Sequence, residues 1–142
     1  MSSRSERLLP AVDQAQRRQQ EALQRLAEQQ RKLAHAQAQW EELKRYRCEY
    51  ALAVGGLSVS ALLNRQQFVE RIDQAIAQQG GLVERLVRQC EGARERWLHA
   101  HARESALDSV VDRLRQDERR HEDRREQHET DERMQHRRRC PA

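Results

Sequence analysis

The sequence predicts an all-α protein, a long antiparallel two-helix coiled-coil hairpin with a C-terminal helical overhang. Apolar residues make up only 37% of the 142 residues, whereas 35% are charged, and this balance suits a narrow helical seam better than a globular core. Five Gly and two Pro leave little material for the turns of a β or α/β fold. An apolar repeat of seven residues also runs through most of the chain, which is typical of a coiled coil.

The first predicted helix covers about residues 8–54 and begins between Ser5 and Pro10. Pro10 should be tolerated only in a first turn, where its missing N–H has no partner to lose. At ~1.5 Å per residue this helix would be about 70 Å long. Two rows of residues repeat along it and predict a left-handed coiled coil. One row is Val12, Gln19, Leu26, Leu33, Trp40, Arg47 and Val54, and the other is Leu8, Ala15, Ala22, Gln29, Ala36, Leu43 and Tyr50.

A bend is predicted at about residues 55–61, where Gly55-Gly56 weakens the helix by roughly 1 kcal/mol per residue. Folding the chain there pairs positions whose numbers sum to about 118, so that Trp40 lies near Ala75 and Gln79. Bulky residues then meet small ones, as interdigitating side chains require. The two seams also end together, which favours an intramolecular hairpin. A parallel dimer of long helices remains an alternative.

The second predicted helix is paired over about residues 62–114 and continues over 115–139 as a charged, unpaired extension. Gly80-Gly81 interrupts its apolar pattern, but the seam keeps its register there, so we expect one helix. The extension has nine Arg, eight acidic residues and three His, with Met134 as its one apolar residue. The predicted seam is Phe68, Ile72, Ala75, Gln79, Leu82, Leu86, Gln89, Ala93, Arg96, Ala100, Arg103, Leu107, Val110 and Leu114, flanked by Ile76, Val83, Cys90 and Trp97.

Several classes of function find no support in the sequence. The three cysteines stand at no metal-ligand spacing and are expected to be reduced thiols of a cytosolic protein. No run approaches the ~20 apolar residues of a membrane span. There is no phosphate-binding Gly loop, and a two-helix rod should offer no concave pocket. The nearly balanced charge of the extension argues against nucleic-acid binding. We therefore expect a soluble, cytoplasmic protein that is no enzyme and has no metal, no cofactor and no membrane insertion.

A set of motifs follows one order along nearly the whole chain: Tyr46-x-x-x-Tyr50, the glycine-containing bend, Gln66-Gln67-Phe68, Trp97, and a charged tail with Thr130-Asp131-Glu132. In this order the chain resembles the FliJ family of flagellar type III export proteins. The resemblance implies an antiparallel coiled coil similar to the central stalk of rotary ATPases. It implies a non-enzymatic coupling stalk, cytoplasmic and peripheral to the inner membrane at the flagellar base.

The resemblance also implies three partners: the hexameric flagellar export ATPase, bound at its centre, the export gate protein FlhA, and export chaperones. The family's exposed gate-binding patch falls on Gln39, Leu43, Tyr46, Tyr50, Phe68, Ile72, Ala75 and Gln79. Gln79 stands where some members have histidine, and Arg47 places a charge inside the patch. The extension would bind the ATPase through Arg119, Arg120, Arg124, Arg125, Glu129, Asp131 and Arg133.

Two other interpretations stay open from the residues alone. In the first, the tyrosines and Phe68 serve only to close the hairpin core. The chain as a whole would also suit a generic cytoplasmic coiled-coil scaffold or dimer without a role in secretion.

Overall fold

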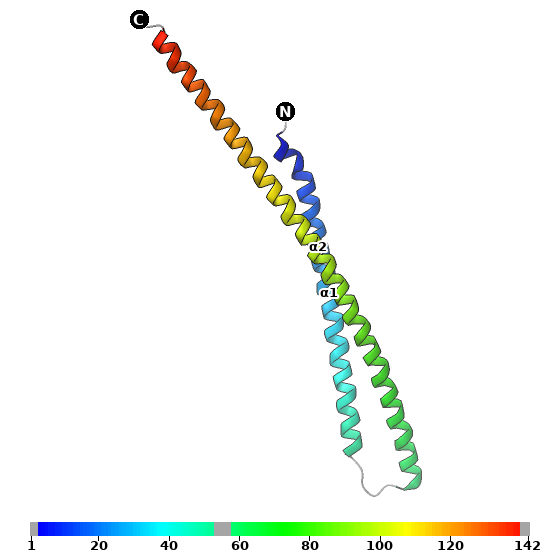
Figure 1. The fold of residues 1–142 in the computed structure, drawn as a ribbon. Coiled ribbons are helices and arrows are strands. Elements are labelled where there is room, and N and C mark those ends of the chain that lie inside the picture. Colours follow the sequence, from blue (N-terminus) through cyan, green and yellow to red (C-terminus); the bar gives the residue numbers. More distant parts are fainter. Residues whose placement is uncertain (1–2, 53–57, 140–142) are drawn as a thin grey trace. The chain divides into compact units, whose positions relative to one another are not determined.

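The computed structural model describes residues 3–52 and 58–139 and consists of two long helices (Figure 1). Helix α1 extends over Arg4–Leu52 and helix α2 over Val59–Arg139. The described residues contain no strand, and the helices pack against each other, so the all-α hairpin is confirmed. The chain divides into two compact units: one joins Met1–Gln20 to His99–Ala142, and the other is Glu21–Leu98.

Helix α1 begins earlier than predicted because a capping box closes its first turn. The Glu6 backbone N–H donates to the Ser3 hydroxyl, and the Ser3 backbone N–H donates to the Glu6 carboxylate, each over 3.3 Å. This reciprocal pair satisfies two of the donors that a helix start leaves without a partner. Pro10 consequently lies inside the helix and not in its first turn, which corrects the prediction. Its nitrogen has no proton for the Glu6 carbonyl, so the helix gives up one internal hydrogen bond there.

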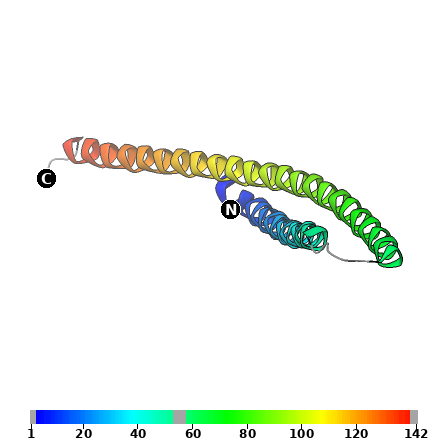
Figure 2. The same ribbon diagram turned by 90° about the horizontal axis from the view of Figure 1, so that it is seen from below.

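Ser58 directly precedes helix α2 and acts as its N-cap, because its hydroxyl accepts a hydrogen bond from the Ala61 backbone N–H over 3.3 Å. The predicted bend at 55–61 lies partly outside the described residues. Val54, at the end of the first seam row, also lies outside them. Gly80-Gly81 falls within α2, which is one uninterrupted helix (Figure 2), as predicted.

The predicted seam of α1 is confirmed at every described position. Each residue in its two rows is buried or half-buried, and Val12, Ala15, Leu26 and Ala36 are at most 9% exposed. Ser5, one heptad before Val12, joins the same row and is 4% exposed.

One of the two predicted seam rows of α2 holds only in part: its Ala75 and Leu82 are half-buried, and Leu82 packs against the core, but its residues after Leu82 are exposed. The row through Ile72, Leu86 and Ala93 is buried or half-buried as expected. The second row that packs in the structure is the one that contains Ile76, Val83, Cys90 and Trp97, which were predicted only to flank the seam. Its members Val69, Ile76, Val83, Cys90, Trp97, Glu104, Val111 and Glu118 are all buried or half-buried, whereas Gln89, Arg96, Arg103 and Val110 are exposed. The second row of a coiled-coil seam lies either three or four residues after the first. Four residues after Ile72 begins the row Ile76, Val83, Cys90 and Trp97, which is more continuously apolar than the row that begins three residues after it.

Within the unit Glu21–Leu98 the two helices run in opposite directions (Figure 1) and pack at the predicted register. The buried core joins Ala36 of α1 to Val83 and Leu86 of α2, with the half-buried Leu33 and Trp40 packed against it. Position numbers of these facing residues sum to about 118, as the sequence indicated.

Three residues hold Trp40 in place, and two of them, Ile76 and Gly80, are next in sequence to the expected neighbours Ala75 and Gln79. Its indole Nε1–H donates to the Ile76 carbonyl oxygen over 3.1 Å. The Lys44 ammonium lies 3.4 Å from the centroid of the ring, a cation–π contact. A Cβ atom at Gly80 would lie 3.2 Å from Cζ2 of Trp40, so the absence of a side chain at Gly80 lets the indole approach α2.

We expect Gly80→Ala and Gly81→Ala to change stability differently, although both remove a helix glycine. Gly81→Ala meets nothing within 4 Å and should raise the free energy of unfolding by about 0.5–1 kcal/mol. Gly80→Ala should not raise the free energy of unfolding, because the added Cβ crowds the Trp40 ring, and such overpacking costs about 1–3 kcal/mol. Urea unfolding followed by circular dichroism measures both variants. Equal stabilisation by the two substitutions would contradict this role of Gly80.

Candidate protein-interaction site

Three aromatic residues from the two helices form one cluster, Tyr46 and Tyr50 of α1 with Phe68 of α2. The Tyr50 and Phe68 ring centroids lie 4.9 Å apart, and the Tyr46 ring meets Phe68 edge-on at 6.3 Å. The two tyrosines are one helical turn apart, with centroids 6.4 Å apart. Tyr46 nevertheless stays 49% exposed and Phe68 37%. The cluster therefore both joins the helices and presents aromatic surface.

Arg65, which the sequence analysis did not single out, anchors this cluster from α2. Its guanidinium donates to the backbone carbonyl oxygens of Tyr50 and Ala51, close to the C-terminal end of α1. Those carbonyls have no partner within their own helix, so the arginine satisfies acceptors that a helix end leaves open. The guanidinium also lies 5.4 Å from the Tyr50 ring centroid. Arg65 lies one heptad before Ile72, and this position in the α2 seam row is the sequence feature that could have predicted its contact with α1.

The structure brings the eight residues of the predicted gate-binding patch into one unit but does not expose all of them. Ile72 is only 6% exposed, which corrects its place on an exposed patch. It belongs to the seam, beneath the residues that reach the surface. Gln39, Tyr46 and Phe68 are exposed, while Leu43, Tyr50, Ala75 and Gln79 are half-buried.

Gln79 links the two helices within this patch. Its side-chain amide donates to the Ala36 carbonyl oxygen over 3.0 Å and to the Gln39 side-chain oxygen over 3.2 Å. Arg47, the charge inside the patch, forms an ion pair with Asp73 of α2, with Nε 2.9 Å from Oδ1. Since both groups stay partly exposed, we regard this pair as worth at most about 1 kcal/mol.

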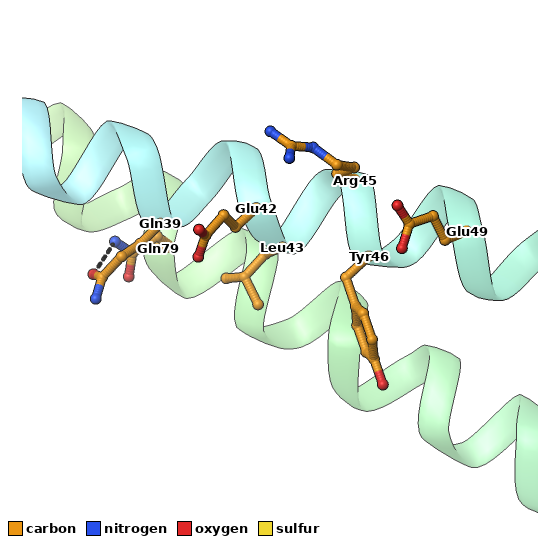
Figure 3. A pocket seen from close by; sticks show the side chains of 7 residues that line it. All are labelled: Gln39, Glu42, Leu43, Arg45, Tyr46, Glu49 and Gln79. Atoms are coloured by element: carbon orange, nitrogen blue, oxygen red, sulfur yellow. Dashed lines mark hydrogen bonds between the residues drawn. The ribbon is translucent and has the colours of Figure 1, made fainter.

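An open groove of about 660 Å³ lies beside the aromatic cluster (Figure 3). The sequence analysis expected no concave pocket, because two helices enclose no interior. A groove forms nonetheless where the side chains of α1 project beside α2. Its lining residues are Gln39, Glu42, Leu43, Arg45, Tyr46, Glu49 and Gln79.

The predicted ATPase-binding residues all lie in residues 119–139 of α2, a segment in which every side chain is exposed. At 100° per residue they point to all sides of the helix and not to one face. The ion pairs and the side-chain hydrogen bond within this segment are local. Arg125 pairs with Glu129 and His128 with Glu132, each four residues apart, and the Thr130 hydroxyl donates to the Glu126 carbonyl. Such pairs contribute about 0.2–0.5 kcal/mol each.

Pairing between the helices reaches further along α2 than the predicted limit at Leu114. In the unit that contains both chain ends, the Ser5 hydroxyl donates to Glu118 Oε2 over 2.8 Å. The Ser5 backbone N–H donates to Glu118 Oε1 over 3.1 Å. The backbone bond and then the hydroxyl bond lower the pKa of the Glu118 carboxyl, because both favour its charged form.

We expect this contact to weaken in acid. Since the folded state lowers the Glu118 pKa, the contact stabilises the protein above the ordinary glutamate pKa and is lost as pH falls through the lowered value. An NMR titration of the Glu118 carboxyl should show its pKa rising in Ser5→Ala. Arg115→Gln, which removes a smaller contribution, should raise it less. Since the backbone N–H bond survives this substitution, an unchanged pKa in Ser5→Ala would contradict the hydrogen bond from the Ser5 hydroxyl.

Other kinds of site receive no support from the described residues. Within 3–52 and 58–139 no group of three or more His, Cys, Asp or Glu could hold a metal ion. Cys48 and Cys90 are free thiols. Neither described helix contains a stretch that is long and apolar enough to cross a membrane.

The fold and the site define a helical-hairpin protein whose distinctive surfaces, an aromatic cluster with a groove and an exposed charged helix, suit contacts with other proteins. The model of one family, described as Flagellar FliJ protein, matches residues 4–140. The chain therefore belongs to the FliJ family, a family of non-catalytic flagellar proteins with a role in export. No curated protein matches the chain, and no solved structure matches it.

Proposed function

We propose that the chain is the coupling stalk of the flagellar type III export apparatus. In this role it binds the centre of the export ATPase hexamer and links it to the export gate protein FlhA, and it also contacts export chaperones. The protein would act in the cytoplasm, peripheral to the inner membrane at the flagellar base. The observation that carries this proposal is the FliJ family match over residues 4–140.

The aromatic cluster supports the assignment of the gate-binding surface. Tyrosine and other aromatic side chains dominate the energetics of protein interfaces when a partner buries them. Tyr46 and Phe68 are already ordered by their contacts with Tyr50, so a partner would meet a preorganised surface.

The C-terminal segment supports the assignment of the ATPase-binding surface. Residues 119–139 are helical, exposed and rich in Arg and acidic side chains. Because those side chains point to all sides, such a helix can contact several subunits of a ring at once. The two candidate surfaces belong to different compact units, so each can be altered separately.

The test is reconstitution of a bridged complex from purified components. The full chain should co-elute with the export ATPase and with the cytoplasmic region of the gate protein in size-exclusion chromatography. With all three present, a single complex should form that is absent without the chain. Binding to neither partner would overturn the proposal. An obligate dimer by light scattering would favour the generic scaffold instead.

A further inference from the structure

The groove beside the aromatic cluster carries charges that have no partner among the described residues. Glu42, Arg45 and Glu49 line it, and all three side chains are exposed. Within the described residues none of them forms an ion pair or a hydrogen bond.

The other edge of α1 is different over the same turns. Lys44 lies 3.5 Å from Glu41, and Arg47 lies 2.9 Å from Asp73. Charges are therefore matched on the edge that faces away from the groove and unmatched along the groove. This asymmetry favours a partner with charged groups on the groove side.

The groove charges have a defined order along α1. Glu42 and Glu49 are seven residues apart and lie on one stripe of the helix, about 10 Å apart along its axis. Tyr46 stands between them, and Leu43 lies beside it. The Arg45 side chain points away from Leu43 and Tyr46 (Figure 3). The face presented to a partner is thus acidic, apolar and acidic in sequence.

This order selects one kind of partner backbone. In a helix, positions i and i+7 share a face and are also about 10 Å apart, with i+3 and i+4 between them. In an extended strand, residues on one face are about 6.7 or 13 Å apart, which fits the two carboxylates less well. Helices that lay one face into a groove are a common form of recognition.

We propose that the groove binds a helical segment of the export gate with two cationic side chains seven residues apart and an apolar side chain between them. The cations pair with Glu42 and Glu49, and the apolar side chain packs on Leu43 and Tyr46. The inference rests on the proposed function, in which this same face of the chain binds the gate.

The test uses the full chain and the cytoplasmic region of the gate protein, with affinity measured by isothermal titration calorimetry at two salt concentrations. The double variant Glu42→Gln/Glu49→Gln should bind about three- to tenfold more weakly and depend less on salt, as expected for exposed ion pairs. Gln is a good helix former, so the variant should keep its helicity. Arg45→Gln, the matched control on the same groove, should bind as tightly as the unaltered chain or more tightly.

Unchanged affinity and unchanged salt dependence in the double variant would overturn the inference. If Tyr46→Ala/Phe68→Ala still abolished binding in that case, the proposed gate-binding role would stand without it. If the aromatic variant also bound normally, the assignment of gate binding to this face would fail as well, and loss of gate binding by the unaltered chain would be needed to overturn the gate-binding role itself. A chain that dimerises by sedimentation velocity, and that the Gln substitutions return to a monomer, would show a second copy in the groove and also overturn the inference.

Discussion

Removal of residues 119–142 is expected to abolish binding and stimulation of the export ATPase while the rest of the hairpin stays folded. Every described side chain of this segment is exposed, and its ion pairs and side-chain hydrogen bond are local, so its loss removes no packing against α1. The cut falls after Glu118, because that carboxylate accepts two hydrogen bonds from Ser5. ATP hydrolysis by the purified ATPase, with and without each form of the chain, measures the effect.

The control for this truncation separates charge from length. A full-length variant with the five arginines of the predicted site changed to Gln should also lose stimulation, because it keeps the helix but not its cations. Arg17→Gln/Arg18→Gln alters exposed arginines of α1 and should stimulate normally. Thermal unfolding of all forms should be alike. A truncated chain that still stimulates the ATPase would show that the binding site lies elsewhere. The five substituted arginines are Arg119, Arg120, Arg124, Arg125 and Arg133.

The seam of α1 could be predicted from the sequence because one pair of rows carries most of its large apolar residues. Gln19 and Gln29 interrupt those rows but remain half-buried, since their neighbours one heptad away fix the face. In α2 the row through Ile72 has candidates on both sides, with Phe68 and Leu82 on one and Val69 and Val83 on the other. The apolar pattern alone did not decide which of these two rows completes the seam. The packing against α1 decided it.

The contacts that hold the site together were less predictable. Arg65 reaches the end of α1, and Gln79 bonds across the seam, because the hairpin brings residues 15 and 43 positions apart into contact. Residue types in one sequence do not specify such pairs. The aromatic residues were recognised through the FliJ resemblance, but the burial of Ile72 beneath them follows from the seam register. The groove arises from side chains of both helices, so no linear motif marks it.

The start of α1 shows how local and distant interactions combine. Ser3 and Glu6 have the spacing of a capping box. The prediction gave more weight to Pro10 and therefore placed the start of the helix too late. The proline costs one hydrogen bond, whereas the capping box and the contact with Glu118 hold the preceding turn. A residue that disfavours a helix therefore lies within one.

The double substitution Tyr46→Ala/Phe68→Ala is expected to reduce binding to the cytoplasmic region of the gate at least about thirtyfold. Central aromatic residues of an interface each contribute about 2 kcal/mol or more, and this variant removes two that are in contact. Because Tyr46 is 49% and Phe68 37% exposed, the hairpin itself should lose much less. Isothermal titration calorimetry measures the affinity, and circular dichroism checks the helicity.

Two matched variants make this last prediction specific. Leu23→Ala removes an apolar side chain of the same compact unit that is 45% exposed but lies outside the patch, and gate binding should not change. Tyr46→Phe keeps the ring and its contact with Phe68, so it should retain most of the affinity. If the double variant binds the gate as tightly as the unaltered chain while the helices remain folded, the aromatic cluster serves only to join α1 to α2. Equal losses in Leu23→Ala would instead point to a general effect of truncating surface apolar side chains.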